Sequence, residues 1–259
     1  MKHSVNQDDL FSLAAFTSAA DYAERTLAAL NSIEDSDNAA VAVVRFRSAF
    51  RLMGADAGVF LSVVRDGPGR TTFRSLLACD PLWAIEYTKG DWEERDPWLR
   101  HAMNHTEPVR ISELRLRPDD EPFIRASAKL GFASAVVAPA PTSAGDARVG
   151  VLCLGSHQPG FFECDAYRSV RVIARALSME LHRWLFQAAR RELLTLSGLT
   201  PDDVDLLRHE EAGHSTKVIC ARLNMEASTI NCRFQRLRAK LGAPDRRTAA
   251  RIARLYGLL

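Results

Sequence analysis

Four residues in the first half of the chain have types and spacing suited to holding a small amphiphile. Trp83 and Tyr87 are four residues apart, so a helix would place both rings on one face. Asp96 follows nine residues after Tyr87 and is succeeded directly by Pro97. An indole donates one hydrogen bond, a carboxylate accepts several, and the rings supply apolar walls, which is typical of a small-ligand pocket. The spacing alone also fits core aromatics, with Asp96 as a turn or helix-capping residue.

A second set of residues, near the end of the chain, has the pattern of two short helices joined by a tight turn. Apolar residues recur at helical spacing behind Ser215, a residue type that caps helix starts. Residues 224–227 interrupt the pattern, and Ser228 is a second predicted N-cap. The helix behind Ser228 carries an apolar stripe at offsets of four, three and four, formed by Ile230, Phe234, Leu237 and Leu241.

The opposite face of this second helix carries amides and cations, and no acid occurs between Ser228 and Leu241. Arg and Lys neutralise phosphates, while Asn and Gln can read adenine in the major groove. The pattern therefore predicts a helix-turn-helix that reads DNA, with Asn231 and Gln235 on bases; a solvated helix face is the alternative. The predicted DNA-binding residues are Lys217, Ser228, Thr229, Asn231, Cys232, Arg233, Gln235, Arg236, Arg238 and Lys240.

The elements that must position these residues follow from periodicity and turn signals. Helices are predicted at 8–33, 41–53, 80–91, 98–104, 121–130 and 165–194. Strands are predicted at 58–64, 71–79, 134–140 and 148–155, with a turn at 67–69. This order predicts an α+β fold, in which an N-terminal α/β/α sandwich with a central antiparallel sheet precedes a C-terminal four-helix helix-turn-helix domain. The predicted domains are 1–189 and 199–259, with a linker at 190–198.

The charge of the chain is unevenly divided between these two parts. From Arg190 to Leu259 there are thirteen Lys and Arg against eight Asp and Glu, a net of +5. The overall charge of +2 therefore leaves −3 for residues 1–189. A basic module joined to a mildly acidic one suits a DNA-binding domain attached to a domain with another partner.

Composition limits the remaining possibilities. The 259 residues include no apolar run of the ~20 residues that cross a bilayer and no signal-peptide pattern, so we expect a cytoplasmic protein with no membrane partner. Five scattered cysteines form no zinc spacing and are expected to be reduced. His101 and His105 are one turn apart but lack a third ligand, so no metal site is predicted. No phosphate loop or nucleophile elbow is present, and neither a cofactor nor a catalytic residue is predicted.

The C-terminal sixty residues resemble the helix-turn-helix of LuxR-type regulators. The resemblance rests on Leu199-Thr200-Pro201, Leu206-Leu207, Ala212-Gly213, residues 218–223, Ser228-Thr229-Ile230 and Lys240-Leu241-Gly242. In that family the last helix helps the domain dimerise, and residues 249–259 fit this role. One departure is Asp202-Asp203 in place of the usual Arg-Glu after Leu-Thr-Pro.

The pattern of Trp83, Tyr87 and Asp96-Pro97, with residues 131–139, resembles the acyl-homoserine lactone-binding domain of the same regulators. The resemblance implies that the indole N–H of Trp83 bonds the lactone carbonyl. It also implies that Asp96 accepts from the ligand amide and that Tyr87 packs on the acyl chain.

Four positions of this ligand domain depart from the family pattern. Cys79 stands where many members have a tyrosine hydroxyl, and Ile111 replaces an aromatic residue, commonly Trp. Ala135 replaces a glycine, and Cys153 a serine or threonine. The loss of a hydroxyl at Cys79 and at Cys153 is expected to weaken ligand binding by on the order of 1 kcal/mol each. The predicted ligand-binding residues are Cys79, Trp83, Tyr87, Asp96, Pro97, Ile111, Ala135 and Cys153.

The function favoured by the sequence is a transcriptional regulator controlled by acyl-homoserine lactone or another small amphiphile. A regulator of the same architecture with no small ligand, controlled by a protein partner or by heterodimerisation, is the alternative. An enzyme acting on a lactone through Asp96 or Cys79 is disfavoured, because no base and nucleophile occur at credible spacing. We expect a homodimer on an inverted-repeat operator, with the apolar residues of the terminal helix forming the contact: Ala250, Ile252, Ala253, Leu255 and Leu258.

Overall fold

A computed structural model of the chain describes residues 12–67 and 70–259. The chain forms two compact units, divided between Val63 and Val64, Thr72 and Phe73, and Trp184 and Leu185. Residues 8–11 of the first predicted helix, and Pro68 and Gly69 of the predicted turn, lie outside the described residues. No helix in the described ranges is both long and apolar enough to cross a membrane.

The centre of the first unit is a five-stranded sheet in the order β2-β1-β5-β4-β3. Its strands are β1 Ala57–Gly67, β2 Arg70–Ala78, β3 Val109–Arg110, β4 Ser134–Ala140 and β5 Arg148–Ser156. The neighbours β3, β4 and β5 are antiparallel, and Val137 lies opposite Cys153. All of β4 and nearly all of β5 are buried, because both faces of the sheet are covered.

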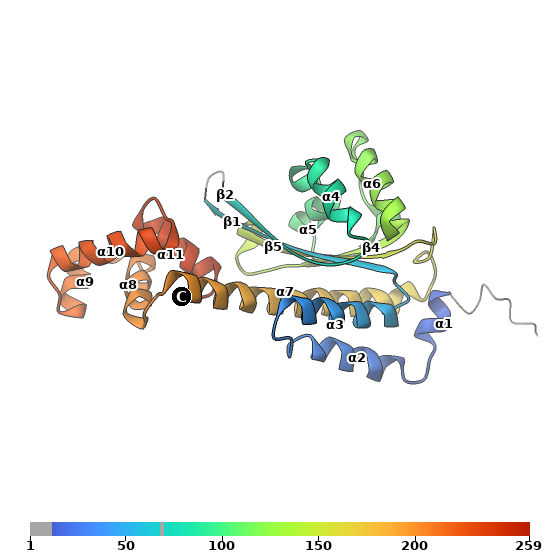
Figure 1. Cartoon of the computed structure of the whole chain (residues 1–259), viewed down its shortest axis with the longest axis horizontal. Helices are drawn as coiled ribbons and strands as arrows, with labels where there is room; N and C mark the ends of the chain where they lie inside the picture. Colours follow the sequence, from blue (N-terminus) through green and yellow to red (C-terminus); the bar gives the residue numbers. More distant parts are fainter. Residues whose placement is uncertain (1–11, 68–69) are drawn as a thin grey trace, which may run out of the picture. The chain divides into compact units, whose positions relative to one another are not determined.

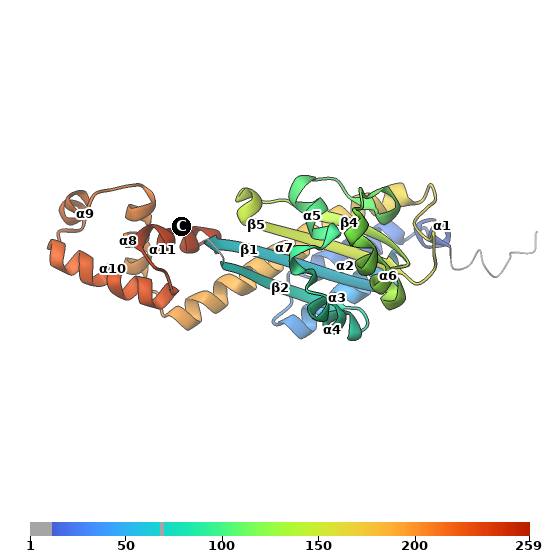
Figure 2. The ribbon, with the colours of Figure 1, turned by 90° about the horizontal axis from the view of Figure 1, so that it is seen from above.

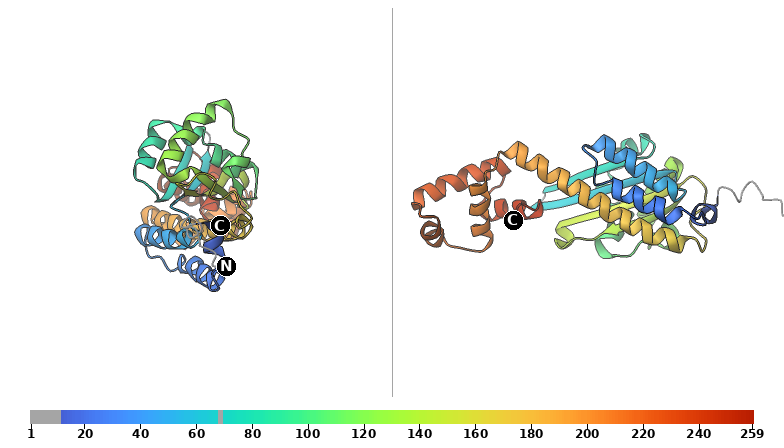
Figure 3. Two further views of the ribbon diagram at one scale, coloured as in Figure 1. Left: turned by 90° about the vertical axis from the view of Figure 1, so that its right-hand side faces the viewer. Right: turned by 90° about the horizontal axis from the view of Figure 1, so that it is seen from below.

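Helices cover the sheet on both faces, which confirms the predicted α/β/α sandwich (Figures 1 and 3). One face is covered by α3 Ala39–Leu52 and the first part of α7 Tyr167–Ser197, and α2 Tyr22–Ser32 packs against α3 on the side away from the sheet. The other face carries α4 Leu82–Lys89, α5 Pro97–Asn104 and α6 Glu121–Ser127. The predicted ligand residues belong to this second face and to the strands beneath it.

The single helix predicted at 8–33 is wrong. The chain forms α1 Leu13–Thr17 and then α2, with Ser18–Asp21 between them. The hydroxyl of Thr17 donates to the carbonyl of Leu13 at 3.1 Å, and that of Ser18 donates to Ala15 at 3.3 Å. Such side-chain bonds offer the backbone an alternative to a continuing helix.

Short elements that periodicity cannot predict complete the unit. Besides β3, these are η2 Trp92–Glu94, η3 Ile111–Glu113, η4 Pro118–Asp120, a π-helical turn at Ala128–Phe132 and η6 Gly145–Ala147. In the π turn Gly131 has a φ of 103°, a conformation that favours glycine. The turn brings Phe132 beside the rings of Trp83 and Trp98.

The second unit contains the four predicted C-terminal helices (Figure 2), which are α8 Pro201–Glu211, α9 Thr216–Leu223, α10 Ala227–Leu241 and α11 Arg246–Leu255. Its core includes Leu206 and Leu207 of α8, Ile219 of α9 and the apolar stripe of α10. Because α7 continues to Ser197, most of the predicted linker 190–198 is helical. Gly198, with a φ of 57°, follows the end of that helix.

Candidate functional site

Asp96 is buried at the start of α5 and is engaged on both carboxylate oxygens. One oxygen accepts from the backbone N–H groups of Trp98 at 2.7 Å and Leu99 at 3.2 Å, which caps α5. The other accepts from the Tyr87 hydroxyl at 2.9 Å. Pro97 occupies the first helical position and is also buried. Asp96 therefore caps α5 and accepts three hydrogen bonds in total. Because a carboxylate has about four lone-pair positions, Asp96 can accept from one more donor.

Trp83 and Tyr87 lie on the inner face of α4, as their spacing predicts. Their rings stack with centroids 4.6 Å apart and planes inclined by 26°. The Trp83 indole nitrogen is buried and has no hydrogen-bond partner among the described residues. A buried donor left unpaired costs about 1–3 kcal/mol, so this N–H is a candidate for bonding a ligand.

Trp98 supplies a second buried indole N–H that has no partner in the part of the chain that the structure describes, and the sequence did not predict it. Its only sequence signal is an aromatic residue directly after Asp-Pro. The Trp98 ring lies 4.7 Å from Phe123 and 5.2 Å from Phe132, between centroids. With Trp92, whose ring is 5.0 Å from Phe123, these side chains form what we call the aromatic cluster. Its members are Trp83, Tyr87, Trp92, Trp98, Phe123 and Phe132.

The sheet beneath the aromatic cluster contributes Ala135 from β4 and Cys153 from β5, both fully buried. Ile111 and Cys79 are partly buried and pack against the same core. The structure thus gathers seven of the eight predicted ligand residues around one core. The eighth, Pro97, directly follows Asp96 in the chain. Proximity alone does not show that they bind a ligand, so their roles stay a prediction.

Burial controls the protonation of this region. It raises the pKa of Asp96 to about 6, against the opposing effects of the Tyr87 hydroxyl, the Leu99 and Trp98 amides and Arg100. Burial, and then the Asp96 charge, raise the pKa of the Cys153 thiol. Burial also raises the pKa of Cys79 to about 12. Both thiols are therefore protonated at neutral pH and are poor nucleophiles, which disfavours an enzyme that uses Cys79.

The helix-turn-helix geometry is present in α9 and α10. Ser215 caps α9, and Asn224 adopts a left-handed φ of 50° in the turn. The apolar stripe of α10 is buried, as predicted. The predicted N-cap at Ser228 is wrong, because Glu226 holds that position and its carbonyl accepts from Ile230 at 3.1 Å.

The polar side chains of α10 are mostly exposed. Asn231, Gln235 and Arg236 lie on its outer face, and Lys217 is exposed on α9. A surface hollow of about 480 Å³ is lined by Ser228, Thr229, Cys232, Arg233 and Arg236. Two arginines and two hydroxyls around an open hollow at a helix start suit a phosphate group.

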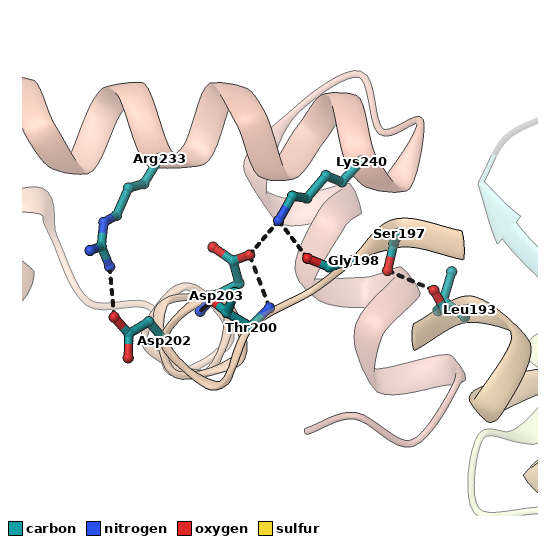
Figure 4. Close-up of polar contacts among 8 residues, drawn as sticks. All are labelled: Leu193, Ser197, Gly198, Thr200, Asp202, Asp203, Arg233 and Lys240. Atoms are coloured by element: carbon teal, nitrogen blue, oxygen red, sulfur yellow. Dashed lines mark hydrogen bonds and ion pairs between the residues drawn. The ribbon is translucent and has the colours of Figure 1, made fainter. Parts of the chain in front are cut away.

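Several predicted DNA-binding side chains already have partners inside this unit (Figure 4). Lys240 pairs with Asp203 at 2.7 Å and donates to the carbonyl of Gly198 at 2.8 Å. Asp203 also forms a capping box with Thr200, so this aspartate both caps α8 and pairs with Lys240. Arg233 pairs more loosely with Asp202, at 3.4 Å.

Two further members of the predicted set have backbone or side-chain partners. Arg238 donates to the carbonyl of Pro244, and Arg246 donates to the side-chain oxygen of Asn231. The guanidinium of Arg246 also lies 4.2 Å from the ring centroid of Phe234. Arg236 contacts only the sulfur of Cys232, at 3.3 Å, among the hydrogen bonds of the described residues.

The terminal helix does not offer the predicted dimer contact. Ala250, Ile252, Ala253, Leu255 and Leu258 are all buried within the single chain. Its exposed face carries Arg247, Arg251 and Arg254 instead. The sequence pattern indicated an apolar face correctly, but that face closes the core of the domain.

His101 and His105 stack with ring centroids 4.4 Å apart and planes inclined by 7°. The His101 ring bonds the carbonyl of Glu107, and the His105 ring bonds the carbonyl of His101, both at 3.1 Å. In the described part of the chain, no three His, Cys, Asp or Glu side chains group as metal ligands.

The fold joins an α/β/α sandwich to a four-helix unit that contains a helix-turn-helix. The family model of the autoinducer-binding domain matches residues 42–185, more than half of the chain. The chain therefore belongs to the autoinducer-binding family and is a LuxR-type quorum-sensing regulator rather than an enzyme.

Solved structures share this fold. A crystal structure of Escherichia coli SdiA has a TM-score of 0.72 at 14% identity, covering 92% of this chain and 99% of that one. SdiA in complex with octanoyl-rac-glycerol has a TM-score of 0.72 at 15% identity, with coverages of 93% and 98%. CepR2 from Burkholderia cenocepacia, an N-acylhomoserine lactone-dependent LuxR family transcription factor, has a TM-score of 0.55 at 20% identity, with coverages of 64% and 96%. A comparison with curated protein sequences gives no match.

Proposed function

We propose that this regulator binds operator DNA and is controlled by a small amphiphile, with acyl-homoserine lactone as the first candidate. Ligand binding is proposed on one observation: the indole N–H groups of Trp83 and Trp98 are buried and have no partner among the described residues. Both belong to the aromatic cluster, whose Tyr87 donates to Asp96. Two donors and one acceptor match a ligand with two carbonyl oxygens and one amide N–H. The aromatic cluster would supply the apolar walls.

In this proposal the Trp83 N–H bonds the lactone carbonyl, and Asp96 accepts from the amide N–H. Trp98 bonds the amide carbonyl, the role of the tyrosine hydroxyl that Cys79 does not supply. The amphiphile class is supported by the octanoyl-rac-glycerol complex of SdiA and by the lactone dependence of CepR2. Because Ile111 stands where the family commonly has Trp, the ligand would lack an indole on that side, so we expect weak or broad lactone recognition.

Thermal unfolding of the full chain with lactones of four to twelve carbons tests the ligand half. We expect a concentration-dependent rise in Tm for the native protein and a smaller one for Trp83→Phe. Restoring the family groups with Cys79→Tyr and Ile111→Trp should strengthen binding. Absence of any shift in all three proteins, with no amphiphile in a lipid extract examined by mass spectrometry, would favour the ligand-free regulator.

The DNA half of the proposal assigns base reading to Asn231 and Gln235, one turn apart on the exposed face of α10. Phosphate contacts are assigned to the four cations Arg233, Arg236, Arg238 and Lys240, and flanking contacts to Lys217, Ser228, Thr229 and Cys232. Arg246 must release Asn231 before that amide can reach a base edge. Selection of binding sites from random DNA should show relaxed preference at one position for Asn231→Ala; an unchanged motif would refute the assignment.

We propose a homodimer on an inverted repeat, with its contact on α7 instead of α11. Val172, Ala176 and Met179 recur at helical spacing on α7, and all three are exposed, Val172 by 59%. A symmetric contact there would cover this apolar stripe. Val172→Asp with Met179→Asp should shift the protein toward monomer in analytical ultracentrifugation and weaken operator binding. A heterodimer using the same stripe is the alternative partner.

We propose the domain limits predicted from the sequence: a ligand-binding domain at 1–189, a linker at 190–198 and a DNA-binding domain at 199–259. Action on DNA also implies a cytoplasmic protein. Expression of residues 199–259 alone, followed by circular dichroism and a DNA-binding assay, tests the second limit.

A further inference from the structure

A groove of about 470 Å³ runs between the outer faces of α4 and α6, and we call it the α4–α6 groove. Its lining residues are Leu82, Glu86, Pro122, Arg125, Ala126, Lys129 and Leu130. Figure 1 shows the two helices side by side above the sheet. The volume lies within the ~300–1,000 Å³ typical of small-molecule sites.

The floor of the α4–α6 groove is apolar. Leu82 is 54% exposed there, although it is a large aliphatic side chain. Ala126 and Leu130 line the groove and also pack against the core that contains the aromatic cluster. The groove is thus separated from that cluster by one layer of side chains, and an apolar chain placed in it would remove Leu82 from water.

One of the charged residues that line the groove, Lys129, makes no ion pair with another described residue. Glu86 pairs with Lys89 at 3.7 Å, and Arg125 pairs with Glu121. Lys129 lies one turn after Arg125 and makes no ion pair or hydrogen bond with another described residue. An apolar floor beside a free ammonium group is complementary to an apolar chain that ends in an anion.

We propose that the α4–α6 groove binds a free medium-chain fatty acid, with its chain on Leu82 and Leu130 and its carboxylate on Lys129. This site is distinct from the lactone site proposed above, because its lining includes no member of the aromatic cluster. A protein partner fits less well: seven lining residues are far fewer than the ~20–30 a side of a stable protein interface.

Isothermal titration of the full chain with dodecanoate and with dodecanol, which has the same chain but no charge, tests the proposal. We expect saturable 1:1 binding of dodecanoate by the native protein. Lys129→Met should weaken dodecanoate binding about tenfold and leave dodecanol binding unchanged. Leu82→Asn should weaken both ligands alike, and because Leu82 is exposed, the fold should persist, which circular dichroism checks.

Arg95→Met is the control for a lost surface cation, since Arg95 lies just after α4, does not line the groove and donates to the carbonyl of Gly90, which does not line it either. It should bind dodecanoate as the native protein does. No saturable binding, or equal loss with Arg95→Met and Lys129→Met, would overturn the proposal. Binding to anionic vesicles without binding to monomeric dodecanoate would also overturn it and indicate a membrane contact. A lactone that saturates the aromatic cluster should not displace dodecanoate, so the two proposals can fail separately.

Discussion

Polar groups differ in burial and in hydrogen-bond partners between the aromatic cluster and the exposed face of α10. In the cluster, two indole N–H groups and a carboxylate are buried, and residues 12–67 and 70–259 supply no partner for either indole N–H. On α10 the polar groups face solvent, and Lys240, Arg233 and Arg238 have partners within their own unit. The first region can gain free energy when a ligand supplies missing partners, because burial has already removed water. In the second region, Lys240, Arg233 and Arg238 must exchange existing partners for phosphates, so each of these three cations contributes less to binding.

The largest effect that would test this contrast is expected at Asp96, through the pH dependence of stability. Its folded pKa of about 6 lies above the ordinary value of 3.8, so the folded state binds the proton more tightly than the unfolded state. The contribution of Asp96 to the unfolding free energy therefore falls as pH rises from about 4 to about 6, by on the order of 2–3 kcal/mol. Burial lowers the pKa of His182 to about 4, which contributes with the opposite sign over the same range, so the Asp96 contribution is measured as the difference between the native protein and Asp96→Asn.

Asp96→Asn should remove that dependence, because its side-chain oxygen still caps α5 while no charge is buried. Denaturant unfolding followed by tryptophan fluorescence measures it, since all four tryptophans precede Leu185. The gain from Asp96→Asn should be larger at pH 7 than at pH 4. Equal differences at both pH values would mean that Asp96 does not titrate in this range.

The next largest effect concerns the two unpartnered indoles. Trp83→Phe and Trp98→Phe should each change the unfolding free energy by less than about 1 kcal/mol, because removing an unpaired buried donor offsets the packing that is lost with the larger ring. Each should weaken lactone binding roughly tenfold or more, since one hydrogen bond to the ligand is lost.

Trp184→Phe is the matched control for both indoles. Trp184 donates to the carbonyl of Ser36 at 2.8 Å, so losing its N–H should destabilise the fold by about 1–3 kcal/mol without affecting the ligand. If all three variants lose the same stability and the same affinity, the distinction between paired and unpaired indoles fails.

A smaller effect is expected when the cations of α10 are compared by their partners. Arg236 has no acidic partner among the described ion pairs, whereas Lys240 is held by Asp203. Arg236→Ala should weaken binding to all DNA sequences by roughly fivefold to tenfold and lower the salt-dependence slope by about one. Lys240→Ala should weaken binding less; the reverse order in titrations at several salt concentrations would contradict the contrast.

The smallest effect is expected for the stability of the second unit. Lys240→Met removes an ion pair that is partly exposed, with side-chain exposures of 32% for Lys240 and 15% for Asp203. Such pairs contribute about 0–1 kcal/mol and weaken with added salt. Thermal unfolding followed by circular dichroism at low and high salt should show a small Tm decrease that shrinks as salt rises.

The sequence by itself determined the element order, the α/β/α sandwich and the buried stripe of α10. These follow from local periodicity and turn residues, because a helix or strand must bury its own apolar side chains. The spacing of Trp83 and Tyr87 likewise placed both rings on the inner face of α4. Periodicity could not predict the two-residue β3, the break between α1 and α2, or the cap at Glu226, because none of these features repeats along the chain.

Only the tertiary structure decided which partner each chemically capable group obtains. Trp98 gave little signal in the sequence, yet packing from α5, α6 and the π turn leaves its N–H buried and unpaired. The apolar face of α11 was visible in the sequence, but whether another chain or its own domain covers it depends on long-range packing. Residues such as Asp203 and Lys240 are 37 positions apart, so local pattern carries no information about the pairing that holds them.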